Sequence, residues 1–272
     1  HQVEASRARQ EAEVVLIGDS SCLMDVSARQ LARSLGRPVL NLGTLSYLDL
    51  NAYALLVREY ARANPGRLRE LVLLMHPEAL RRASPEPYYV QTLQALLNYE
   101  ITKTDHSMHE TVAGILGLSR FRDCCLARLL PVPLGGAFGR RYGFNQDLEN
   151  YLTLHSGSLV EPAAMPFSGN AEYRLAGPLE RASRAFRAAV PAGCRLVVGI
   201  TPVPAGFVQP NYPQDHAAML RQWSQWLHAD AALQGLPAVL PDAHFAKTTH
   251  LNQSGVAIYT TLLASNLVGI SP

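Results

Sequence analysis

One stretch near the start of the chain constrains the fold most, because a buried strand there runs directly into a helix. Residues 13–17 are strand-like and end in the turn Gly18-Asp19-Ser20. A helical pattern follows to residue 35, with apolar side chains at spacings near three and four. In open α/β sheets, ligands bind at the carboxyl ends of strands, where this turn lies. Ser20 is therefore a candidate nucleophile, and the alternative is that it only caps the helix.

Strand and helix patterns alternate along most of the chain. We expect further strands at 37–43, 70–75, 194–201 and 237–240, and helices at 47–63, 173–190, 216–233 and 254–267. This alternation predicts a parallel sheet whose crossover connections are right-handed. The predicted fold class is an α/β, three-layer α/β/α sandwich with about five parallel strands.

The alternation stops between residues 81 and 170. We expect this stretch to be a helical and irregular insertion, or a lid, within one domain that spans residues 1–272. Inside it, Tyr142 and Asn145 belong to a cluster of polar and aromatic side chains and are candidate substrate contacts, with an ordinary turn as the alternative.

Composition excludes several classes of protein. A net charge of +2 is too small for a nucleic-acid-binding footprint. The four cysteines show no Cys-x-x-Cys spacing, and His106 and His109, one helical turn apart, are better explained as part of a solvated helix face, so neither a metal nor a cofactor is predicted. We expect Cys22 to be a small buried side chain, and Trp223 and Trp226, three residues apart, to pack in the core.

Three motifs together resemble one protein family. They are Gly-Asp-Ser after the first strand, Asn41-x-Gly43 after the second, and Thr-His-Leu-Asn-x-x-Gly around His250 before the last helix. This combination resembles the SGNH (GDSL-type) hydrolase superfamily. The ending is most similar to the branch of envelope-polysaccharide O-acetyltransferases, the relatives of the alginate-acetylation and D-alanylation proteins. The resemblance implies an SGNH or flavodoxin-like sandwich.

The resemblance also implies roles for four residues. Ser20 would attack an ester carbonyl to give an acyl-enzyme, and His250 would accept and return the proton. The Gly43 amide would line the oxyanion hole. His76 stands where the family has asparagine, and an imidazole N–H could donate there with a pH dependence that asparagine lacks.

The third member of the expected triad is missing from its usual place. The family's acid stands three residues before the catalytic histidine, and that residue here is Lys247, which cannot accept the imidazole N–H. Asp242 would serve as the acid if its loop folds back, and a Ser–His dyad oriented by a backbone carbonyl is the alternative. Loss of the acid can cost on the order of 10⁴-fold in rate in related triads.

The resemblance finally implies a function, a location and partners. We expect serine-dependent transfer of an acyl group, with acetyl as the expected group, or ester hydrolysis, at hydroxyls of an envelope polysaccharide or exopolysaccharide. The alternative is a catalytically degenerate SGNH-like subunit that binds polysaccharide or a partner enzyme. The expected location is periplasmic or extracytoplasmic, with a membrane anchor outside this sequence. The expected partners are the polysaccharide and a membrane-bound acyltransferase or polysaccharide synthase complex.

Overall fold

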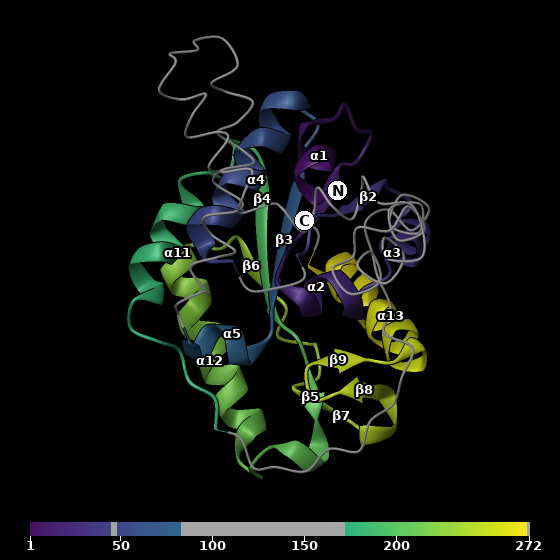
Figure 1. Cartoon of the computed structure of the whole chain (residues 1–272), viewed down its shortest axis with the longest axis vertical. Helices are drawn as coiled ribbons and strands as arrows, with labels where there is room; N and C mark the ends of the chain where they lie inside the picture. Colours follow the sequence, from purple (N-terminus) through teal and green to yellow (C-terminus); the bar gives the residue numbers. More distant parts are fainter. Residues whose placement is uncertain (45–47, 83–171, 271–272) are drawn as a thin grey trace, which may run out of the picture.

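The computed structural model describes residues 1–44, 48–82 and 172–270. Its main sheet has five parallel strands in the order β2-β1-β3-β4-β6 (Figure 1). These strands are β1 (Val14–Gly18), β2 (Val39–Asn41), β3 (Glu70–Met75), β4 (Arg195–Ile200) and β6 (Ala231–Ala232). The predicted α/β class with a five-stranded parallel sheet is therefore confirmed.

Helices cover both faces of this sheet and give the three layers (Figure 1). One face carries α4 (Leu50–Ala63), α11 (Leu179–Arg187) and α12 (Tyr212–Leu227). The other carries α2 (Ser20–Asp25), α3 (Ala28–Leu35) and α13 (Gln253–Gly269). Two short helices complete the set within the described residues: α1 (Gln2–Arg7) packs on α4, and α5 (Pro77–Arg82) follows β3.

The first strand shows why its sequence is uniformly apolar. Val15 and Ile17 pack into the core beneath α4, α11 and α12, whereas Val14 and Leu16 pack into the core beneath α3 and α13. Alternate side chains of a strand point to opposite faces, and here both faces are covered by helices. All four side chains are therefore buried, and no polar residue interrupts the run.

Small elements gather at the carboxyl end of the sheet, at the bottom of Figure 1. There β5 (Val203–Pro204) and β7 (Val239–Leu240) form a parallel pair, and β8 (Phe245–Lys247) and β9 (His250–Leu251) form an antiparallel hairpin. Two 3₁₀ turns, η2 (Ala205–Phe207) and η3 (Asp242–His244), accompany them. Among the described helices, none combines the length and the hydrophobicity needed to cross a membrane.

Several element boundaries differ from the sequence-based predictions, each for a local reason. The single helical pattern expected after Ser20 forms two helices, because Ser27 caps the second one with its side chain, which accepts from the Gln30 N–H at 3.2 Å. The helix expected from Tyr173 begins only at Leu179, directly after Pro178, because a proline disfavours helical geometry in the residue before it.

The elements after residue 210 differ from the sequence-based prediction. The helix expected at 216–233 spans Tyr212–Leu227 and ends where His228 adopts a left-handed φ of 44°. The residues beyond it supply β6, the fifth strand, whereas the strand expected at 237–240 forms β7 and pairs with β5. The predicted core packing of Trp223 is confirmed, since its side chain is 0% exposed, and Trp226 packs beside the same core.

Most of the predicted insertion lies outside the described residues. Only its first two residues, Arg81 and Arg82, are described, and they end α5. The candidate substrate contacts Tyr142 and Asn145 and the histidine pair at 106 and 109 are among the residues that the structure does not describe.

Candidate active site

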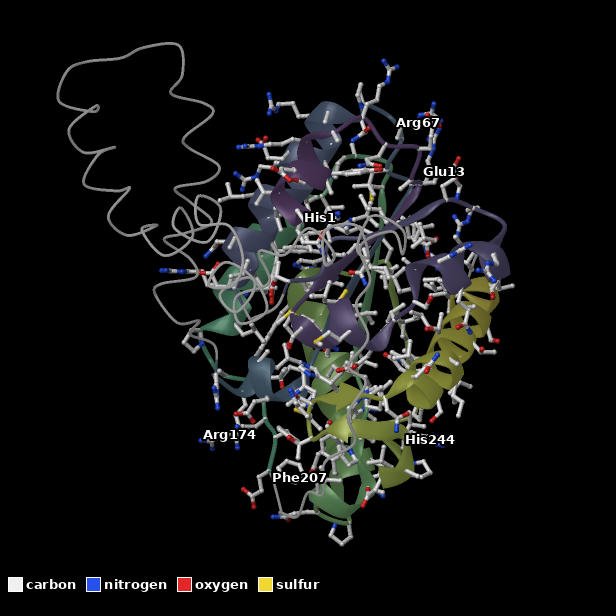
Figure 2. All side chains as sticks on the ribbon, turned by 45° about the vertical axis from the view of Figure 1, so that its right-hand side comes forward. His1, Glu13, Arg67, Arg174, Phe207 and His244 are labelled. Carbon is white, nitrogen blue, oxygen red and sulfur yellow. The ribbon has the colours of Figure 1, made fainter. Side chains whose placement is uncertain are left out.

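The candidate site lies at the carboxyl edge of the sheet, where the strand order reverses. The chain passes from β1 to β2 on one side and then to β3 on the other, so β1 and β3 flank a topological switch point. Ligands of open α/β sheets bind in the crevice at such a point. In Figure 2, Glu13, which precedes β1, lies in the upper part of the molecule, and His244, which precedes the β8–β9 hairpin, lies in the lower part. The hairpin is thus placed at the ligand-binding edge.

The nucleophile and base expected from the sequence meet at this edge. Ser20 Oγ lies 2.9 Å from Nε2 of His250, across 230 residues of sequence. Ser20 is the first residue of α2 and follows the tight turn at Gly18, where an added Cβ would overlap the carbonyl oxygen of Leu74. Only glycine fits there, and the turn brings the half-buried hydroxyl to the histidine ring.

The motif around His250 fixes the hairpin from which the ring projects. Asn252 caps α13 by accepting from the Ser254 and Gly255 amides, each at 3.1 Å, and its Nδ2 donates to the Ala243 carbonyl at 2.7 Å. An added Cβ on Gly255 would overlap the carbonyl oxygen of His244. The asparagine and glycine of the motif therefore set the backbone on which the histidine depends.

His76 enters the site as a neutral, buried ring. Its side chain is 3% exposed, and its Nδ1 accepts from the Glu78 N–H at 3.1 Å. Burial, with a smaller contribution from the charge of His250, lowers the pKa of His76 to about 3, and the Thr248 carbonyl opposes this shift weakly. Because Nδ1 is an acceptor, the neutral ring carries its proton on Nε2. The pH dependence expected of His76 would therefore appear only in acid, near this pKa.

Nε2 of His76 has the character expected of an oxyanion donor. It is buried and makes no hydrogen bond of good geometry to the described residues, although the Thr248 carbonyl is near enough to favour the protonated ring. Folding has already removed this N–H from water, so binding an oxyanion there carries no further desolvation cost for the donor.

Asp19 links the strand ends around the nucleophile, a role that sequence reasoning missed. One carboxylate oxygen accepts from the Ser21 N–H at 3.0 Å and from Ser21 Oγ at 2.6 Å, and the other accepts from the His76 N–H at 3.0 Å. Thr201, directly after β4, donates to Ser21 Oγ at 3.0 Å. Burial raises the pKa of Asp19, whereas these hydrogen bonds and the charge of His250 lower it. The only sequence feature that indicated a role for Asp19 or Thr201 is that each lies at the end of a predicted strand.

Gly43 lies beside α2, but its amide is engaged. The Gly43 N–H donates to Oδ1 of Asn41 at 2.8 Å, and Nδ2 of Asn41 donates to the Cys22 carbonyl at 2.8 Å. A Cβ on Gly43 would lie 2.5 Å from the Leu23 nitrogen, so the close approach to α2 requires glycine. An oxyanion at this position would have to share the amide with Asn41.

Asp242, the candidate acid, and Lys247, which stands where the acid is expected, lie in different elements. Asp242 begins η3, is exposed, and accepts from the Gly206 N–H at 2.9 Å. Lys247 stands opposite His250 in the β8–β9 hairpin, in a register that contains a bulge. The role of Asp242 as the orienting acid therefore stays a prediction.

Two chemical alternatives near the nucleophile find little support among the described residues. Cys22 is fully buried, as expected, and burial together with the charges of Asp19 and Asp25 raises the pKa of its thiol well above the usual value. A thiol of this kind is a poor nucleophile. Nowhere in the described ranges do three His, Cys, Asp or Glu side chains form a group that could hold a metal ion.

A polar pocket of about 480 Å³ lies next to Tyr173, a residue that contacts His76. Tyr173 forms part of its wall and meets the His76 ring edge-on, with ring centroids 6.0 Å apart. The remaining lining residues are Arg81, Glu172, Arg174, Gln209, Asn211, Tyr212 and Asp215. Positive and negative side chains are balanced in this lining, so the pocket suits a neutral hydroxylated molecule better than an ion.

Comparison with known proteins found no matching family model, no matching curated protein and no matching solved structure.

Proposed function

We propose that this protein transfers an acyl group, with acetyl as the expected group, through a covalent intermediate on Ser20, either to a polysaccharide hydroxyl or to water. The contact of 2.9 Å between Ser20 Oγ and Nε2 of His250 carries the proposal. A serine hydroxyl is a weak nucleophile, and a histidine within hydrogen-bond reach is what activates it.

In the first half-reaction, Ser20 Oγ attacks the carbonyl carbon of an ester, and its proton passes to Nε2 of His250. The carbon–oxygen bond of the ester then breaks, and the same proton moves from His250 to the departing alcohol. The acyl group remains on Ser20 as an ester.

In the second half-reaction, a sugar hydroxyl or a water molecule attacks the acyl-enzyme. His250 takes the proton of the attacking group and returns it to Ser20 Oγ as the serine ester breaks. Transfer and hydrolysis share every step except the identity of this acceptor.

Both half-reactions pass through a tetrahedral oxyanion, which needs hydrogen-bond donors. The proposed donors are Nε2–H of His76 and the N–H of Ser20, an amide in the first turn of α2 that helical hydrogen bonding leaves without an acceptor. Because the His76 ring stays neutral, it acts as a fixed dipole rather than as a competing acid.

Substrate, partners and location follow from the family resemblance. The proposed acceptor is an envelope polysaccharide or exopolysaccharide, and the proposed acyl source is a membrane-bound acyltransferase or synthase complex. The proposed location is periplasmic or extracytoplasmic. The polar pocket beside Tyr173 is a candidate position for the acceptor sugar.

The test is release of p-nitrophenol from p-nitrophenyl acetate across pH 6 to 9. We expect wild type to be active and Ser20→Ala to be inactive, with a serine-reactive phosphonate labelling Ser20 in wild type. The matched control is Ser254→Ala, because Ser254 Oγ lies 3.2 Å from Nδ1 of His244 and forms a second Ser–His contact in the described structure. The Asn252 cap accepts from the Ser254 backbone N–H, which this variant keeps, so its activity should be unchanged.

A second candidate function is a non-catalytic subunit that binds polysaccharide or a partner enzyme. The observation that favours it is Lys247, which stands opposite His250 in the hairpin and cannot accept an imidazole N–H. Wild type no faster than Ser20→Ala, with Ser20 unlabelled by the phosphonate, would establish this alternative. If the enzyme is active, adding oligosaccharide acceptors separates transfer from hydrolysis.

A further inference from the structure

A buried carboxylate at the far end of the nucleophile helix makes a contact that the proposed chemistry does not use. Asp25 is the last residue of α2 and is 0% exposed. Its Oδ1 accepts from the Leu251 N–H at 2.8 Å, across 226 residues of sequence. Leu251 is the residue that directly follows His250.

This contact attaches the histidine strand to the helix that carries the nucleophile. The helix α2 is six residues long and holds Ser20 at its first position and Asp25 at its last. One end of the helix thus meets the side chain of His250, and the other end meets the backbone of the next residue. Two attachments fix the position of a strand relative to a helix better than one does.

The alternative explanation is that Asp25 is a buried acid without a role, but burying a carboxylate has a free-energy cost. Burial raises the pKa of both Cys22 and Tyr259, and the negative charge of Asp25 adds to each shift, so the carboxylate lies close to both side chains. Burying such a group is unfavourable unless hydrogen bonds meet it. The Leu251 N–H donates to Asp25, and an apolar residue at position 25 could not accept this hydrogen bond.

We propose that Asp25 is a positioning residue of the active site: through the Leu251 N–H, it holds His250 at hydrogen-bonding distance from Ser20. This inference rests on the proposed function and deepens it. The hairpin carries Lys247 where an orienting acid is usual, and Asp25 supplies orientation through the backbone instead. The contact with the Leu251 N–H requires only that the side chain at position 25 offers an acceptor oxygen.

The test compares Asp25→Asn, which keeps an acceptor oxygen, with Asp25→Ala, which removes it. For p-nitrophenyl acetate hydrolysis, we expect Asp25→Ala to lower kcat on the order of 100-fold with little change in KM, because small displacements of a catalytic group cost rate rather than binding. Asp25→Asn should restore most of the lost rate. Thr260→Val is the matched structural control, since buried Thr260 makes a similar contact by accepting from the Ser27 N–H at 3.0 Å, away from the hairpin.

A measurement without turnover keeps this inference separate from the proposed function. We would follow the imidazole signals of His250 by NMR against pH in wild type, Ser20→Ala, Asp25→Ala and Asp25→Asn. Loss of the serine contact should change the His250 titration in Ser20→Ala, and Asp25→Ala should change it in the same direction, whereas Asp25→Asn should follow wild type.

The outcomes differ for the two claims. An inactive wild type whose His250 titration still responds to Ser20→Ala and Asp25→Ala would overturn the proposed enzyme and support the positioning role of Asp25. A titration that responds to Ser20→Ala and not to Asp25→Ala would overturn the positioning role. So would Thr260→Val losing as much activity as Asp25→Ala, because the effect would then be general destabilisation.

Discussion

Replacing His76 with asparagine should remove a defined part of the acid sensitivity of this protein. Burial is the main reason that the pKa of His76 falls from 6.5 to about 3 in the folded chain. Between these two values, the unfolded chain binds a proton that the folded chain does not. Stability contributed by the neutral ring is therefore fully present above pH 6.5 and is lost as the pH falls toward 3.

The size of this effect follows from the two pKa values. Between pH 7 and pH 5 the unfolded histidine takes up about three-quarters of a proton and the folded histidine almost none. Since one pKa unit corresponds to about 1.4 kcal/mol, the free energy of unfolding of wild type should fall by about 2 kcal/mol over this interval because of His76 alone. His216, which is also buried with a lowered pKa, adds a loss of the same sign in every variant that retains it.

The assay is urea unfolding at pH 7 and pH 5 for wild type and His76→Asn. The absolute stability of the variant will differ, because a buried ring has been replaced, so the relevant quantity is the change between the two pH values. That change should be smaller in the variant by about 2 kcal/mol. His228→Asn, at an exposed histidine, controls for the loss of one histidine from the chain. Equal pH dependence in wild type and His76→Asn would refute the conclusion that the fold keeps this ring neutral.

The same variants test the oxyanion role. Asparagine offers a side-chain N–H in nearly the same place, so His76→Asn should keep most of the esterase activity, whereas His76→Ala should lose about 10²–10³-fold in kcat, as for other single oxyanion donors. Unchanged activity in His76→Ala would remove His76 from the mechanism without affecting the stability argument.

Three further predictions concern the surroundings of the site. Asp242→Asn distinguishes two sources of orientation: orientation through Asp25 predicts retained esterase activity, since the exposed Asp242 carboxylate accepts from the Gly206 N–H, whereas a loss on the order of 10⁴-fold would identify Asp242 as the orienting acid. Ser21→Ala removes one hydrogen bond to Asp19 and should lower the free energy of unfolding by about 1–3 kcal/mol in chemical denaturation, while phosphonate labelling of the nucleophile persists. Gly255→Ala places a Cβ against the His244 carbonyl, so it should lower the melting temperature and reduce activity together; a melting temperature equal to that of wild type would show that the hairpin can move aside.

The main strands could be predicted from the sequence because their signals are local. The first and third strands are unbroken apolar runs, and the order of strands and helices implies parallel pairing. The fifth strand could not be predicted in the same way. Ala231–Ala232 is two residues long, and its extended form depends on pairing with Val197 and Val198 of β4. A segment this short has no periodicity of its own.

The candidate site also contains parts that could be predicted from local sequence and parts that could not. Ser20 could be proposed from its place between a strand and a helix, whereas the role of His250 was implied by the resemblance of its motif to a known family. The supporting contacts could not, because each joins distant parts of the chain: Asp19 meets the His76 amide across 57 residues, and Thr201 meets Ser21 across 180. The sequence placed these groups at strand ends, but which ends meet depends on the strand order.

The short helix α2 suggests why a lysine can occupy the position of the usual acid. An acid behind a catalytic histidine does two things, since it orients the ring and it stabilises the imidazolium that forms. In this protein the Asp25–Leu251 contact can supply orientation, because it fixes the backbone of the histidine strand to the helix that bears Ser20. Asp25 stabilises the imidazolium less directly than a triad acid does, since it accepts from the backbone rather than from the ring. The proposed enzyme should therefore keep a well-defined Ser–His geometry and have a slower proton-transfer step than a full triad, which a solvent deuterium isotope effect on acylation would reveal.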